Sequence, residues 1–135
     1  MLAPMTAKTA RLWIAGSGAL GTAALAYVAT VDPHRPGAVF PFCPFQVITG
    51  WDCPACGGLR MTHDVLHGNL SAAVHDNVFL LIGLPLLAVW SLWRLHRGRQ
   101  VVSTALLIVL GVATIGWTVV RNLPGFPLVP TMLIS

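Results

Sequence analysis

Residues 101–120 read VVSTALLIVLGVATIGWTVV, a stretch that carries no charge. A membrane-spanning helix needs about 20 consecutive apolar residues, so this stretch is long enough to cross a bilayer. Two further runs share its character: residues 12–30 (LWIAGSGALGTAALAYVAT) are uncharged, and residues 78–95 (VFLLIGLPLLAVWSLWRL) stay apolar until Arg94. The sequence therefore predicts an all-α integral membrane protein with three transmembrane helices.

The composition of the whole chain agrees with a membrane environment. The 135 residues are 56% hydrophobic and 9% charged, with a mean hydropathy of +0.76, whereas soluble domains are about 25% charged. The net charge of +4 comes from basic residues that flank the apolar runs instead of forming a patch. This pattern argues against nucleic-acid binding and indicates a lipid bilayer as the partner. At this length we expect a single membrane domain.

The first apolar run has two interpretations. In the first, it is a signal peptide: Lys8 and Arg11 precede it, Ala24-Leu25-Ala26 resembles a cleavage site, and residues 1–26 would be removed. In the other, close glycine spacing lets a retained helix pack tightly against another helix. The glycines concerned are Gly16, Gly18 and Gly21. We expect a retained helix.

Basic residues near the ends of the runs predict the orientation. They lie before the first run and between the second and third, at Lys8, Arg11, Arg94, Arg97 and Arg99. Short cytoplasmic loops carry an excess of Lys and Arg, so the N-terminus is expected in the cytoplasm. The long connection of residues 31–77, which holds all four aspartates, then lies on the outer side of a cell inner membrane.

The connection of residues 31–77 is expected to be irregular at first and helical later. Residues 31–37 are proline-rich, which excludes a regular helix, and residues 39–45 suggest an aromatic loop at the level of the lipid headgroups. Residues 59–76 repeat apolar side chains at helical spacing but are too short to span, so they predict one or two short interfacial helices. Gly68 and Asn69 would separate the two, and Ser71 is the expected N-cap of the second.

The only three cysteines of the chain, Cys43, Cys53 and Cys56, all lie in this connection. The turn Cys-Pro-Ala-Cys-Gly at residues 53–57 has the form of a zinc knuckle, in which a glycine such as Gly57 permits the tight bend. Cys53, Cys56 and Cys43 would supply three ligands to a tetrahedral metal ion, and a histidine could supply the fourth. Candidate ligands for zinc or another soft metal are therefore Cys43, Cys53, Cys56, His63 and His67.

Two other interpretations use the same sulfur atoms. A structural disulfide from Cys43 to Cys53 or Cys56 would clamp the loop in an oxidising compartment, although it leaves one cysteine over. A reactive dithiol is the third interpretation, because Cys-x-x-Cys at a helix start lowers a thiol pKa. We predict in each case that the three cysteines form one cluster.

Arg60 follows Cys56 by four residues, so on a helix it lies over the cysteine turn. We expect its guanidinium to point inward, where it would bind a loop carbonyl, stabilise a thiolate or neutralise Asp52 or Asp64. Three other histidines lie at loop or span ends and are expected to be solvated. They are His34, His75 and His96.

The cysteine segment resembles the signature of a family of small bacterial membrane proteins known as domain of unknown function twenty-seven fifty-two. The residues that carry the resemblance are Cys43-Pro44-Phe45, Thr49-Gly50, Cys53-Pro54, Cys56-Gly57, Arg60, Leu66, Gly68-Asn69, Ala72-Ala73 and Asn77. The chain departs from the pattern at Leu59, where the family has a threonine, and at Val78, where a proline often follows the asparagine. The resemblance implies a membrane location and a shared cysteine site, and supplies no reaction.

No complete active site is recognisable in the sequence. We therefore expect a non-enzymatic accessory or scaffold subunit of a larger membrane complex, whose cysteine loop presents Phe42, Phe45 and Trp51 to a protein partner. The alternative is a thiol-redox or metal-handling membrane protein that uses Cys53 and Cys56.

Overall fold

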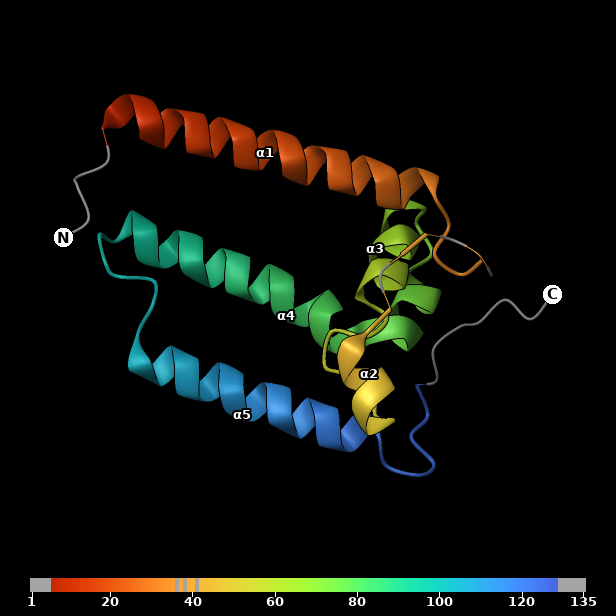
Figure 1. The fold of residues 1–135 in the computed structure, drawn as a ribbon. Coiled ribbons are helices and arrows are strands. Elements are labelled where there is room, and N and C mark those ends of the chain that lie inside the picture. Colours follow the sequence, from red (N-terminus) through yellow and green to blue (C-terminus); the bar gives the residue numbers. More distant parts are fainter. Residues whose placement is uncertain (1–5, 36, 38, 41, 129–135) are drawn as a thin grey trace.

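The computed structural model describes residues 6–128 except 36, 38 and 41, and all regular structure within these residues is helical. Five helices follow one another along the chain (Figure 1). They are α1 (Ala7–Thr30), α2 (Pro44–Thr49), α3 (Gly58–Leu66), α4 (Leu70–His96) and α5 (Thr104–Arg121).

Three of these helices are long and apolar enough to cross a membrane: α1 over Arg11–Thr30, α4 and α5. They run side by side, and the start of α1 and the α4–α5 turn lie at one end of the molecule (Figure 1). Helices α2 and α3 lie at the opposite end (Figure 1). The predicted fold class is therefore confirmed: the chain is an all-α multi-pass membrane protein with short helices in its first connection.

The ends of the helices follow local sequence signals, with two differences from expectation. Asn69, and not Ser71, is the N-cap before Leu70, because its side chain accepts a hydrogen bond from the Ala72 N–H at 3.2 Å. Residues 44 and 45 are helical and not part of a loop, since a proline is well suited to the first position of a helix, as Pro44 is in α2.

Helix α4 combines the second interfacial segment with the second span. It is interrupted at Asn77, whose φ of −163° and ψ of 83° are not helical. The side chain of Asn77 accepts a hydrogen bond from the Leu80 N–H at 3.0 Å, so it caps the membrane-spanning part of the helix. The break therefore lies directly before the apolar run that begins at residue 78, and the helix continues through Pro85.

Most of the tertiary packing lies at the end that contains α3. Helix α3 packs against α4 and α1, and the buried apolar side chains of the described residues are Val28, Met61 and Ala73, from these three helices. The expected tight packing of the α1 glycines is not found within this chain. A Cβ added at Gly16, Gly18 or Gly21 would meet no atom within 4 Å.

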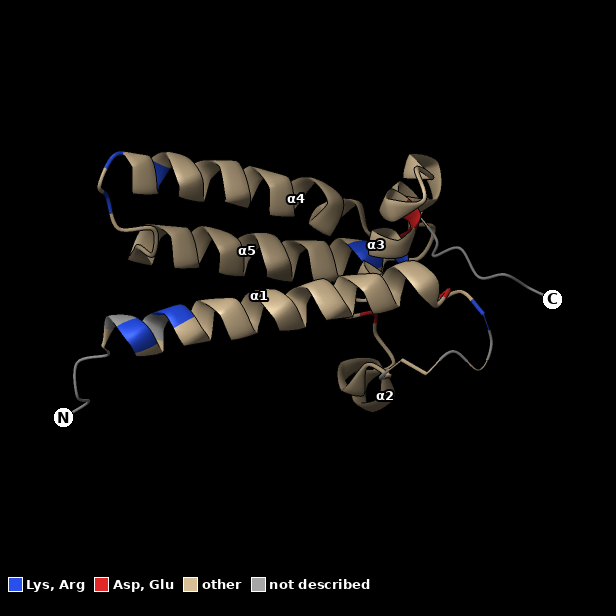
Figure 2. Cartoon of the chain, turned by 90° about the horizontal axis from the view of Figure 1, so that it is seen from above, with Lys and Arg blue, Asp and Glu red and all other residues tan. Residues whose placement is uncertain are grey.

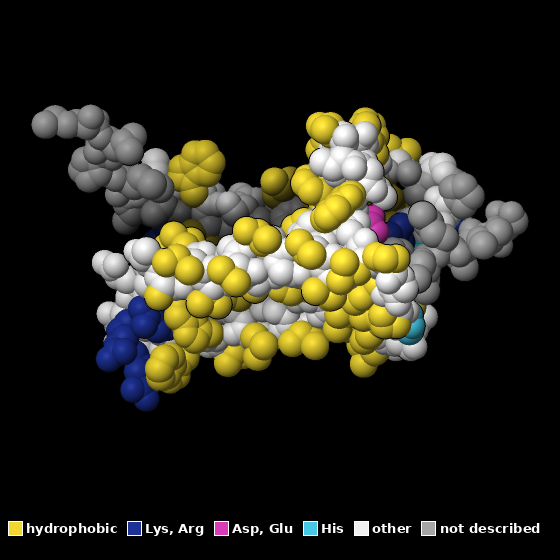
Figure 3. Space-filling model, turned by 90° about the horizontal axis from the view of Figure 1, so that it is seen from below, with side chains coloured by type: hydrophobic (Ala, Val, Ile, Leu, Met, Phe, Trp, Pro, Cys, Tyr) yellow, Lys and Arg dark blue, Asp and Glu magenta, His cyan; other side chains and the backbone are white. Residues whose placement is uncertain are grey.

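Charge is distributed unevenly between the two ends. Many of the Lys and Arg residues lie at the end formed by the start of α1 and the α4–α5 turn, whereas the acidic residues lie at the end of α2 and α3, together with the other Lys and Arg residues (Figure 2). Between the ends, hydrophobic side chains cover the visible helix surfaces (Figure 3). This is the surface expected of helices surrounded by lipid.

Candidate functional site

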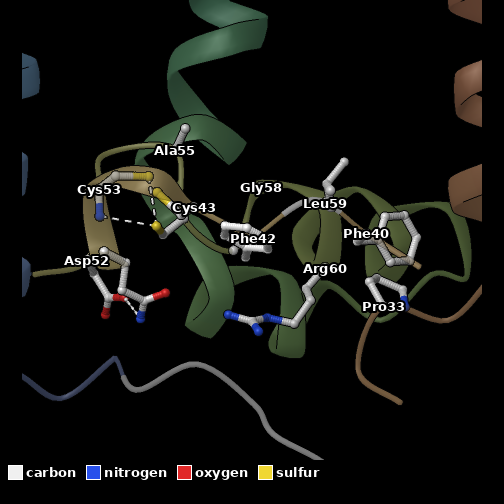
Figure 4. Close-up of a pocket in the computed structure, with 13 residues that line it drawn as sticks. Pro33, Phe40, Phe42, Cys43, Asp52, Cys53, Ala55, Gly58, Leu59 and Arg60 are labelled. Atoms are coloured by element: carbon white, nitrogen blue, oxygen red, sulfur yellow. Dashed lines mark hydrogen bonds between the residues drawn. The ribbon is translucent and has the colours of Figure 1, made fainter. Parts of the chain in front are cut away.

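The sulfur atoms of Cys43, Cys53 and Cys56 lie within 4.8 Å of one another (Figure 4). Cys43 is the N-cap of α2, whereas the other two belong to the turn before α3. The Cys56 thiol donates to the Cys53 sulfur at 2.7 Å, and the Cys53 N–H donates to the Cys56 sulfur at 3.1 Å. The predicted single cluster is therefore present, and we call it the cysteine cluster.

Asn77 fixes the cysteine turn from the side of α4. Its side-chain N–H2 group donates to the carbonyls of Pro54 and Cys56, both at 3.0 Å, and its residue is 1% exposed. Buried carbonyls need such donors, because an unpaired buried polar group costs about 1–3 kcal/mol. The break in α4 therefore contributes to the site, because it lies at the residue whose amide side chain binds the cysteine turn.

Arg121, at the end of α5, fixes the same turn from a second side. One guanidinium nitrogen, Nη1, donates to the carbonyls of Cys53 and Cys56, each at 3.0 Å, and the residue is 8% exposed. Its guanidinium also lies over the Trp117 ring, 5.6 Å from the ring centre. Sequence reasoning missed this role, because Arg121 stands alone after the third apolar run and belongs to no motif.

Asn122 adds a third attachment beside the cluster. Its side chain accepts from the Asp52 N–H at 2.8 Å and donates to the Asp52 carbonyl at 2.9 Å. The backbone N–H and carbonyl of Asp52, the residue before Cys53, are therefore both hydrogen-bonded to one side chain. The cysteine turn is consequently held by side chains from α4 and from the end of α5.

The three thiols have different surroundings. The backbone N–H of Gln46 lowers the pKa of Cys43, with further lowering from the thiol of Cys53. Burial raises the pKa of Cys56 to about 12, and the neighbouring thiols add to this. At neutral pH in the absence of a metal, Cys43 is therefore favoured as the thiolate over Cys56, in agreement with the hydrogen bond that Cys56 donates.

A cavity of about 500 Å³ extends from the cysteine cluster along the start of α3. Figure 4 shows the sulfurs at one end, Pro33 and Phe40 at the other, and Arg60 between them. Arg60 is turned into the protein as expected, with 19% of its side chain exposed. The acidic side chain beside it is that of Asp76, which the sequence analysis did not name: the Nε atom lies 3.5 Å from Oδ1 of Asp76.

A second cluster, which we call the His/Asp cluster, consists of His34, Asp64 and Asp76. His34 Nε2 lies 3.1 Å from Oδ2 of Asp76 and 3.6 Å from Oδ2 of Asp64. Its other nitrogen, Nδ1, lies 2.9 Å from Oδ1 of Asp32. The expectation that His34 is solvated is therefore wrong: 7% of its side chain is exposed, because three carboxylates surround the ring.

The two histidines proposed as metal ligands lie away from the cysteines. His63 Nδ1 is 2.7 Å from the Val28 carbonyl, and its Nε2 is 3.8 Å from Oδ1 of Asp32. The His67 ring lies against the His63 ring, with centres 4.2 Å apart. Among the described residues, the cysteine cluster contains the three sulfurs and neither imidazole.

Three aromatic residues expected to face a partner are on the surface. Phe42 is 80% exposed, whereas Phe45 and Trp51 are 40% and 47% exposed. His75 and His96 are also exposed, as expected from their positions at loop and span ends.

The fold and the site together define a class: a small multi-pass helical membrane protein with a three-cysteine cluster at one end of its helices. Residues 43–91 match the family described as Protein of unknown function (DUF2752), which confirms the resemblance over this segment. The matched segment contains the whole cysteine cluster, α2, α3 and most of α4. No curated protein and no solved structure matches the chain.

Proposed function

We propose that this protein binds a soft metal ion, Zn²⁺ or Cu⁺, through the thiolates of Cys43, Cys53 and Cys56. The observation that supports the proposal is the convergence of three sulfurs within 4.8 Å from two segments of the chain. Thiolates select soft and borderline metals, and Zn–S bonds of about 2.3 Å place sulfurs roughly 3.8 Å apart. The Cys53 and Cys56 sulfurs would separate by about 1 Å when a metal replaces the thiol proton between them.

The attachment of the cysteine turn favours a metal site further. Asn77 and Arg121 hold the carbonyls on either side of the sulfurs, so the turn is fixed before a ligand arrives. The positive charge of Arg121 also offsets part of the negative charge of three thiolates. Metal sites depend on such surrounding contacts, whose loss typically weakens binding 10–100-fold.

A three-thiolate site has an open coordination position. Structural zinc sites are closed by four protein ligands, whereas a site with three keeps a place for an exchangeable ligand. In the described part of the chain the cavity beside the sulfurs is where such a ligand would enter. We therefore favour metal handling, such as uptake or transfer of the ion, over a purely structural zinc knuckle.

Cadmium titration tests this function. We expect the reduced protein in detergent to bind one Cd²⁺ with the ultraviolet absorption band of thiolate-to-metal charge transfer. Cys43→Ser should weaken this binding by more than about 100-fold, because it removes a ligand atom itself and not only an outer contact. Serine is a good helix N-cap, so α2 should be retained in this variant.

A matched control places the same new side chain on the exposed face of α2. Val47, which is 69% exposed, can be changed to serine without approaching the sulfurs. Val47→Ser should bind Cd²⁺ as the unaltered protein does. A fully reduced protein that gives no thiolate band would contradict the proposal, and a disulfide among these cysteines in cells would support the clamp interpretation instead.

We further propose that the cysteine cluster faces the outside of the inner membrane. The basic residues at the opposite end support this orientation by the positive-inside rule. A membrane-impermeant maleimide, applied to intact cells after mild reduction, should label the cysteines. Labelling that requires cell lysis would show the reverse orientation.

An accessory role in a larger membrane complex is a second candidate. The exposed surfaces of the three spans support it. Within this chain, between 0% and 6% of the residues in the most apolar stretch of each span are buried, so most of each helix surface is free to contact another protein. Phe42 extends from the same end, at 80% exposure. Crosslinking in membranes followed by purification should recover a stable stoichiometric protein partner, and Phe42→Ser should reduce the yield of that partner.

A further inference from the structure

We propose that the His/Asp cluster is a second metal site, selective for a hard or borderline divalent cation such as Mn²⁺ or Fe²⁺. Its ligands would be Nε2 of His34 and one carboxylate oxygen each from Asp64 and Asp76. They come from three parts of the fold: the loop after α1, helix α3 and the first part of α4. The proposal is independent of the cysteines, because none of these ligand atoms belongs to the cysteine cluster.

The first observation is a buried carboxylate oxygen that lacks a hydrogen bond. The Asp64 side chain is 9% exposed, and its Oδ2 accepts no hydrogen bond within the described chain. This oxygen points toward Nε2 of His34, at 3.6 Å, and toward the fully buried Asp76. A carboxylate in such a place costs several kcal/mol unless a proton or a positive charge, such as a metal ion, compensates it.

The second observation is the position of the His34 ring between carboxylates. Nδ1 is 2.9 Å from Oδ1 of Asp32, and Nε2 is 3.1 Å from Oδ2 of Asp76. A proton between Nε2 and Asp76 satisfies this contact; in a neutral imidazole with its N–H at Nδ1, the lone pair of Nε2 faces two carboxylates, and a metal ion can take the place of that proton. A carboxylate on the distal nitrogen of a metal-binding histidine is the usual arrangement that fixes the ring and its tautomer.

The spacing of the three ligand atoms fits a small divalent cation. Metal–ligand bonds of about 2.1 Å place neighbouring ligand atoms roughly 3.0 Å apart in octahedral and 3.4 Å apart in tetrahedral geometry. The distance from Nε2 to Oδ2 of Asp76, 3.1 Å, lies between these values, and the distance to Oδ2 of Asp64, 3.6 Å, exceeds the larger by about 0.2 Å. All three ligand atoms lie within 4.8 Å of one another.

The charges around the cluster leave it anionic. Three carboxylates converge here, from Asp32, Asp64 and Asp76. Two arginines pair with them: Arg60 lies 3.5 Å from Oδ1 of Asp76, and the exposed Arg35 lies 3.5 Å from Oδ2 of Asp32. Arg60 approaches the oxygen of Asp76 that does not face His34, so it would remain in place beside a bound ion. Oxygen and imidazole ligands suit Mn²⁺, Fe²⁺ and Zn²⁺, whereas Cu⁺ prefers sulfur.

Manganese binding measured by electron paramagnetic resonance tests the second site separately from the first. Mn²⁺ has little affinity for thiolates, so the loss of the aqueous Mn²⁺ signal reports the His/Asp cluster. We expect one equivalent to bind to the full-length protein in detergent. Asp64→Asn, which keeps the shape and removes the charge, should weaken binding at least about tenfold.

Two control variants test whether Mn²⁺ binds at the His/Asp cluster. One removes a carboxylate elsewhere, and the other removes a thiol of the cysteine cluster. Asp52→Asn removes a carboxylate that bonds Gln46 instead and should bind Mn²⁺ normally. Cys43→Ser should do so too, even though it loses Cd²⁺. Failure of the cysteine proposal would abolish the cadmium band only, whereas failure of this proposal would leave Mn²⁺ unbound or bound equally by Asp64→Asn.

Thermal stability gives a second measurement, for which a metal site and an imidazolium predict different results. If the cluster binds a metal, Mn²⁺ should raise the unfolding temperature of the unaltered protein and not that of Asp64→Asn, since the ion joins α3, α4 and the loop after α1. If His34 is instead an imidazolium that pairs with the aspartates, Mn²⁺ should have no effect on either protein. That second result would overturn the proposal.

Discussion

Gly57→Ala is expected to destabilise the protein by about 3 kcal/mol and to disrupt the cysteine turn. Gly57 has a φ of +82°, which costs a residue with a side chain about 1–2 kcal/mol. A Cβ at this position would also overlap the backbone carbonyl of Asp76. That carbonyl is part of α4 and cannot rotate away as a side chain can, so the overlap adds roughly 1–3 kcal/mol.

Gly50→Ala is the matched control for this substitution. Gly50 has a similar φ of +72° at the end of α2, but an added Cβ there would meet no atom within 4 Å. Its cost should therefore be the conformational part alone, about 1–2 kcal/mol. Unfolding in detergent mixtures, followed by tryptophan fluorescence, would measure both. Equal destabilisation by the two substitutions would show that the contact between the turn and α4 contributes nothing.

Arg121→Met should cost about 3 kcal/mol and weaken soft-metal binding 10–100-fold. Methionine has a similar apolar stem but cannot donate the two 3.0 Å hydrogen bonds to the carbonyls of Cys53 and Cys56. The Cys56 carbonyl would keep its bond from Asn77, whereas the Cys53 carbonyl would lose its charged donor. Hydrogen bonds to charged groups contribute about 1.5–3 kcal/mol each.

The control for Arg121 is another arginine at the opposite end of the molecule. Arg99 is exposed in the α4–α5 turn, and Arg99→Met should change stability by less than about 0.5 kcal/mol. Thermal unfolding and cadmium titration of both variants would measure the two effects. An Arg121→Met protein that unfolds normally and binds Cd²⁺ with full affinity would show that the cysteine turn is held without α5.

Histidine 34 shows where sequence reasoning failed. Its neighbours Asp32, Pro33 and Arg35 are typical of a solvated loop, and nothing local marks the ring as buried. The ring is enclosed because α3 and α4 bring Asp64 and Asp76 to it, from 30 and 42 positions further along the chain. For the same reason the sequence could not show that His63 contacts the Val28 carbonyl and the His67 ring, and not the sulfurs. Helical spacing shows which residues share a face, but not what that face contacts.

The sequence by itself determined the three spanning helices and the approximate place of the break before residue 78. Lipid is the reason: an uncharged run of about 20 residues must form its backbone hydrogen bonds internally, so the helix follows from composition alone. The closeness of Cys53 and Cys56 also follows locally, from their separation by two residues in a turn closed by Gly57.

Only the tertiary structure decided which distant groups complete the two clusters. Cys43 joins the cysteine turn, Asn77 and Arg121 hold its carbonyls, and His34 meets Asp64 and Asp76. These contacts depend on how the cysteine turn meets α4 and the end of α5, and on how α3 packs against α1 and α4. Side chains that pair across separate elements leave no periodic signal in either element, because each appears in the sequence as an isolated polar residue.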